Sequence, residues 1–132
     1  MDIAAMNAML DAAYGTTRAA HCPGDHDLAL FYGDPRDGGT ELDPTGGYAR
    51  VTVDDSDWNA AASGEKSTGW VSFPAPTDAW SDEATHWALF DGVTLWDSGP
   101  LDSPLEVTGA GPGPLVRVTV RFATSIVPEE AP

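Results

Sequence analysis

The amino-acid sequence predicts an all-β fold: an antiparallel β-sandwich or small barrel of about seven strands with one short N-terminal helix. The first observation is a series of short apolar runs, several of which alternate between apolar and polar residues. The second is that glycine- and proline-rich turns separate these runs, with no helical pattern between them. The third is the length of 132 residues, which fits one domain. We expect a helix or arm over residues 1–14, a β-sandwich domain over 15–127 and a flexible tail over 128–132.

The predicted helix spans residues 2–14. Its apolar residues fall near helical spacing, and Gly15 is well placed to end it. A helix this short is marginal alone in water, so we expect it to dock on the body or on a neighbouring subunit. Met6, Met9 and Leu10 on its apolar stripe are therefore candidate interaction residues.

Strands are predicted where a short apolar run ends at a turn signal. They cover residues 28–32, 48–53, 67–73, 85–90, 93–96, 105–107 and 115–122. The pair Asp91-Gly92 indicates a tight hairpin. In the second strand, alternation places Val51 and Val53 on the buried face and Tyr48 on the opposite face. The residues expected in the core are Val51, Val53, Val71, Phe73, Trp87, Leu89, Leu95, Val118 and Val120.

The charge of the chain excludes several classes of partner. Asp and Glu total 21 and Lys and Arg total 6, which gives a net charge of −15. This charge repels phosphate backbones and anionic membrane surfaces, so we expect neither nucleic acid nor a membrane as a partner. The single cysteine, Cys22, excludes a disulfide within the chain.

No catalytic or metal-binding motif stands out. His21, Cys22 and His26 lie close together in sequence, but the paired spacing of a tetrahedral zinc site is missing. The acidic segment 54–57 lacks the spacing of a calcium loop and is more typical of a solvated turn. Carboxylate pairs are unavoidable among 21 acidic residues and carry no specific signal. We therefore expect no enzyme, no cofactor and no metal.

The 5 tryptophans divide into two groups by position. Trp70, Trp87 and Trp96 lie in apolar strand runs, which indicates core packing. Trp58 and Trp80 lie in predicted loops and are the candidates for an interaction surface. Exposed tryptophans can stack on sugar rings, so these two residues also raise the hypothesis of a carbohydrate-binding module.

Several short motifs follow one another in a defined order. They are Ala29-Leu30-Phe31-Tyr32-Gly33-Asp34-Pro35, Gly47-Tyr48-Ala49-Arg50, Val71-Ser72-Phe73-Pro74, Asp78-Ala79-Trp80, and the segment 85–91 followed by Leu95-Trp96. Their joint order resembles a family of tailed-bacteriophage virion proteins labelled as tail fibre proteins. The resemblance covers about residues 28–100 and implies a virion structural protein. The C-terminal third departs from it, because a proline-rich loop at 109–114 replaces a glycine–aspartate turn.

We expect a structural protein of a tailed-phage virion, and favour a capsid-surface decoration or minor capsid role. A compact acidic domain without a fibrous repeat suits repeated docking on a lattice. The alternative is a tail fibre or tail-tip protein, with a carbohydrate-binding role in host attachment. Expected partners are other virion proteins, either the major capsid protein or tail proteins, and further copies of the chain as a homo-oligomer.

Overall fold

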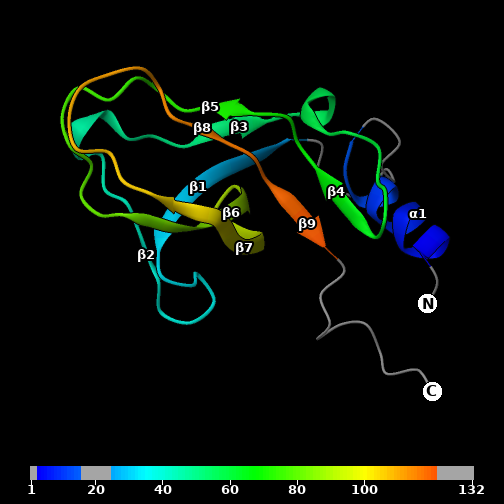
Figure 1. Ribbon diagram of the computed structural model, residues 1–132. Coiled ribbons are helices and arrows are strands. Elements are labelled where there is room, and N and C mark those ends of the chain that lie inside the picture. Colours follow the sequence, from blue (N-terminus) through cyan, green and yellow to red (C-terminus); the bar gives the residue numbers. More distant parts are fainter. Residues whose placement is uncertain (1–2, 16–24, 122–132) are drawn as a thin grey trace.

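The computed structural model describes residues 3–15 and 25–121, and this part of the chain is mostly short antiparallel strands (Figure 1). The elements are α1 (Ile3–Ala13), β1 (His26–Tyr32), β2 (Thr40–Glu41), η1 (Thr45–Gly47), β3 (Val51–Val53), η2 (Asp55–Asp57), β4 (Glu65–Ser67), β5 (Val71–Ser72), β6 (Ala84–Asp91), β7 (Thr94–Leu105), β8 (Leu115–Val116) and β9 (Thr119–Arg121). The predicted all-β, sandwich-like class with one N-terminal helix is confirmed, and no closed barrel forms among the described strands.

The larger sheet is built on β1 and β6. Its strands lie in the order β2-β1-β6-β7. The short strands β2 and β3 pair with the same edge of β1, β2 near the end of β1 and β3 near its beginning. The predicted hairpin at Asp91-Gly92 joins β6 to β7, with Asp91 opposite Thr94. Gly92 adopts a φ of 65°, which a glycine enters without steric cost.

The second layer is a two-stranded ribbon. It pairs β5 with β8 and β4 with β9, and the N–H of Thr68 donates to the carbonyl of Val118 between these pairs at 2.9 Å. The predicted strands 67–73 and 115–122 are therefore each broken into two pieces. The hydroxyl of Thr68 accepts a hydrogen bond from the N–H of Val118 at 3.1 Å, and this side-chain bond replaces a regular step of the ladder.

The core lies between the sheet and the ribbon. Seven of the nine expected core residues are buried, whereas Val51 and Leu95 are only partly buried. Leu95 packs on the outer face of the sheet instead, against a smaller cluster of Ala29, Phe31 and Ala88. Consecutive residues of a strand point to opposite faces, so a strand with apolar residues on both faces supplies both clusters.

Tyr48 is buried, although alternation predicted that it would face outward. It precedes β3, so the period of that strand does not apply to it. Its hydroxyl accepts a hydrogen bond from the N–H of Leu30 and donates one to Glu41, both at 2.9 Å. Burial raises the pKa of the Tyr48 phenol, which keeps the hydroxyl protonated as a donor.

The N-terminal helix α1 packs beside β4 (Figure 1). The side chain of Asn7 accepts a hydrogen bond from the N–H of Gly64 at 2.8 Å, and Asp11 accepts one from the N–H of Ala61 at 2.9 Å. Asp11 also pairs with the ammonium group of Lys66 at 2.6 Å, and the side chain of Lys66 is only 4% exposed. The expected docking of the helix on the body is thus seen. Within the described ranges, no helix has the length and apolar character needed to cross a membrane.

Candidate functional site

Trp58 and Trp80 are core residues, so the expectation that they form an exposed surface is wrong. They are 8% and 6% exposed. The ring centroids of Trp58 and Tyr14 lie 4.6 Å apart. Trp80 packs edge-on against Tyr48, with 5.4 Å between the ring centroids. A loop residue with a large apolar side chain gains stability by folding back over the core, and both do so. Binding of partners by Trp58 and Trp80 remains a prediction, but neither side chain is accessible in the folded domain.

Trp70 and Trp96 were expected in the core, and the structure corrects both positions. Trp70 is 62% exposed and Trp96 is 37% exposed, whereas Trp87 is buried as expected. Val71 faces the core from β5, so the residue before it must face outward. Trp96 lies at the surface beside His26, with ring centroids 5.7 Å apart.

The three candidate residues of the helix have different surroundings. Leu10 is buried against the body, Met6 is half-buried beside Gly64, and Met9 is about half exposed. Leu10 therefore acts in docking the helix within the chain. Contact with another virion protein through Met6 or Met9 remains a prediction.

The residues considered for metal binding do not meet in the described part of the chain. That part contains no cluster of three or more histidine, cysteine, aspartate or glutamate side chains around one point. His26 is buried between Tyr14 and Trp96, and burial lowers its pKa. In the acidic segment, Asp54 accepts a hydrogen bond from the N–H of Ser56 and so caps η2. His21 and Cys22 lie outside the described residues.

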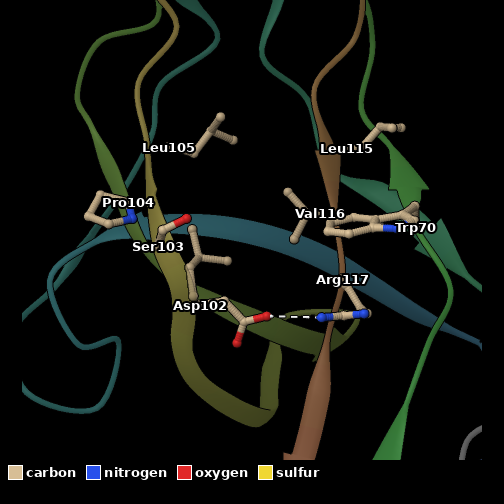
Figure 2. Close-up of a pocket in the computed structure, with 9 residues that line it drawn as sticks. Trp70, Asp102, Ser103, Pro104, Leu105, Leu115, Val116 and Arg117 are labelled. Carbon is tan, nitrogen blue, oxygen red and sulfur yellow. Dashed lines mark ion pairs between the residues drawn. The ribbon is translucent and has the colours of Figure 1, made fainter.

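An open groove of about 130 Å³ lies between β7 and β8 (Figure 2). One wall comes from β7 and the other from the ribbon. The lining residues are Trp70, Leu101, Asp102, Ser103, Pro104, Leu105, Leu115, Val116 and Arg117. Sequence reasoning missed this groove, because its walls come from segments far apart in the chain.

The β7 wall is formed by a large bulge. Ala84 pairs with Leu105 and His86 pairs with Pro100, so residues 101–104 lie opposite a single residue of β6, Thr85. All four of these residues line the groove. A bulge bends the strand and aims its side chains away from the regular ladder, which explains the hollow here.

The opposite wall is set by strand register. Val71 pairs with Val116, and both are buried, so the neighbouring residues Trp70 and Arg117 share the outer face. The guanidinium carbon of Arg117 lies 4.9 Å from the centre of a Trp70 ring, a cation–π contact. Leu115, two residues from Arg117, is 57% exposed on the same face.

One ion pair crosses the groove. Arg117 and Asp102 reach toward one another from the two walls, with 3.5 Å between a guanidinium nitrogen and a carboxylate oxygen (Figure 2). Both side chains are about half exposed. The groove thus combines an exposed indole, an apolar lining and a paired set of charged hydrogen-bonding groups.

Comparison with known proteins identifies the family. The family model described as podophage GP4 fiber I protein gp80 matches residues 1–110. The match contains Trp70 and the β7 wall of the groove, whereas Leu115, Val116 and Arg117 lie beyond it. No curated protein and no solved structure matches the chain. A match over most of the chain, together with the β-sandwich fold, shows that this protein belongs to the podophage fiber I protein gp80 family and is a structural protein of a tailed-phage virion.

Proposed function

We propose that this protein is a component of a podophage tail fibre. The observation that carries the proposal is the match of residues 1–110 to a family described as podophage fiber I proteins. The capsid-surface role that the sequence favoured rested on the compact acidic domain and on the lack of a fibrous repeat. A small sandwich is equally suited to a terminal or attachment position in a fibre, so compactness does not favour the head.

The proposed role is structural and non-catalytic, and its partners are other virion proteins. The net charge of −15 makes identical copies repel one another at long range. Assembly into a homo-oligomer or onto a tail protein therefore requires specific contacts at short range. Exposed apolar side chains away from the groove, such as the half-exposed Met9 and the fully exposed Val93, support such contacts.

The position and copy number of the protein in purified virions test the proposal. Antibodies to the protein, labelled with gold, are expected to mark the tail in electron micrographs. Quantitative mass spectrometry against the major capsid protein is expected to find few copies per particle. Labelling spread over the head, with copy numbers comparable to the capsid lattice, would instead establish the capsid-surface role.

A further inference from the structure

We propose that the groove between β7 and β8 binds a neutral saccharide, with Trp70 as the stacking platform. This inference rests on the proposed function, since a fibre component is placed to meet the host surface. The site differs from the one that the sequence suggested, because Trp58 and Trp80 are buried. It is built instead from Trp70, Asp102, Ser103, Leu115 and Arg117.

The exposure of Trp70 is the first observation. An indole that is 62% exposed leaves a large apolar surface in water, which costs free energy unless a ligand covers it. The guanidinium carbon of Arg117 lies 4.9 Å from the centre of the ring, a cation–π contact that favours this orientation of the indole. A pyranose ring has an apolar face of C–H groups, and such a face packs on an indole held in a fixed orientation.

The polar groups of the groove are the second observation. A saccharide carries hydroxyls around the edge of its ring, and each hydroxyl both donates and accepts hydrogen bonds. Arg117 supplies donors and the carboxylate of Asp102 supplies acceptors, with 3.5 Å between the two groups. Ser103 on the same wall adds a hydroxyl. The indole can therefore pack on the apolar C–H face of a sugar ring while the paired donors and acceptors bind its hydroxyls.

The charge balance indicates a neutral ligand. Arg117 is already paired with Asp102, so the groove has no excess positive charge. The other cationic side chains that the structure describes, Arg36, Arg50 and Lys66, also pair with carboxylates. A sialylated, uronic or phosphorylated glycan would meet a protein of net charge −15 and, at the groove itself, an arginine that is already paired with a carboxylate.

The shape of the β7 wall disfavours an extended peptide as the occupant. Peptides often bind by adding a strand to an open sheet edge, which needs regular N–H and carbonyl groups along that edge. Here the wall is a bulge, residues 101–104, and it contains Pro104, which has no N–H to donate. The groove therefore presents side chains where an added strand would need backbone groups.

Binding to defined oligosaccharides tests the proposal with the full-length protein. The probes are neutral oligomers of glucose, galactose, mannose, rhamnose and N-acetylglucosamine, beside sialylated and uronic-acid oligomers. We expect at least one neutral probe to bind and to shift the NMR signal of the Trp70 indole N–H. Trp70→Ala and Arg117→Ala should each weaken that binding roughly ten-fold or more. Tyr32→Ala is the matched control, because Tyr32 is 54% exposed and does not line the groove.

Three results would overturn the inference. They are the absence of binding to every neutral probe at millimolar concentration, exclusive binding of anionic probes, and unchanged binding in Trp70→Ala. Incorporation of the same variants into virions is measured in parallel. Normal incorporation without any saccharide binding would reject the saccharide site and leave the fibre role intact. Loss of incorporation in Trp70→Ala without saccharide binding would identify the groove as a contact between virion proteins, which also rejects the site.

Discussion

Trp70 and Val71 are neighbours in the chain, and one lies at the surface while the other is in the core. The alternation of side chains along a strand could have predicted this difference, because Val71 and Phe73 are both inward-facing. Assigning Trp70 to the core from its position within the predicted strand 67–73 overlooked this alternation. Trp58 and Trp80 could not be placed in this way, since a loop has no period and their burial depends on the tertiary structure.

At the residue scale, we predict that Trp80→Ala destabilises the domain and Trp70→Ala does not. Trp80 is 6% exposed and packs on Tyr48 and Phe73, so its removal should lower the free energy of unfolding by about 3–5 kcal/mol. Trp70→Ala removes an exposed cation–π contact and should cost about 1 kcal/mol or less. Urea denaturation of both variants measures the difference. Equal losses would show that the two indoles contribute alike to the core.

At the scale of elements, the helix α1 is held by polar contacts as well as by apolar burial. Its apolar spacing predicted docking, and Leu10 and Tyr14 are indeed buried. No local pattern indicated that Lys66, which is 3% exposed, would lie under the helix and pair with Asp11. Such a pair joins residues 55 positions apart, so it follows from the tertiary arrangement and not from local pattern.

We predict that Asp11→Ala loosens the helix and destabilises the domain. The ammonium of Lys66 would stay buried without its carboxylate, and removing one partner of a buried pair is strongly destabilising. The expected loss is about 3 kcal/mol, at the lower end of the range for such pairs, because Asp11 itself is partly exposed. Urea denaturation measures the loss, and Asp82→Ala at an exposed site is the control. Recovery of stability in the double variant Asp11→Ala, Lys66→Met would identify the unpaired charge as the cause.

The same contact should make stability depend on pH. The hydrogen bond from Lys66 holds the pKa of the Asp11 carboxyl below its ordinary value of 3.8. Because the pKa is lower in the folded state, the contribution is complete above this ordinary value and is lost as pH falls through the folded pKa. Melting temperatures measured from pH 5 to pH 2 should therefore decline less steeply for Asp11→Asn than for the parent. Parallel curves would show that Asp11 does not contribute to acid sensitivity.

At the scale of the whole molecule, the sequence predicted the fold class but not the groove. Turn signals and short alternating runs are local, and they are sufficient to indicate an antiparallel sandwich. The long β7 was predicted as two pieces, 93–96 and 105–107, because Gly99-Pro100 is a break signal that a bulge accommodates here. The groove depends on that bulge and on pairing between Val71 and Val116, which no local pattern reveals.

We predict that salt strengthens self-association of the purified protein. Copies with a net charge of −15 repel one another, and added salt screens this repulsion over a Debye length of about 10 Å at 0.1 M. Sedimentation velocity from 20 mM to 500 mM sodium chloride should show larger species, or a tighter association constant, as salt rises. Weaker association at high salt would show instead that ion pairs hold the copies together.

The hydrogen bond of Tyr48 also interrupts one edge of the larger sheet. The Tyr48 hydroxyl accepts a hydrogen bond from the N–H of Leu30. Leu30 lies between the residues of β1 that pair with β3 and those that pair with β2. This edge of the sheet therefore ends in fragments of two and three residues, with no long strand offering unpaired backbone groups. An edge of this kind is a poor template for another chain to pair with. Contacts between virion proteins at this edge of the sheet therefore depend on side chains and not on added backbone pairing.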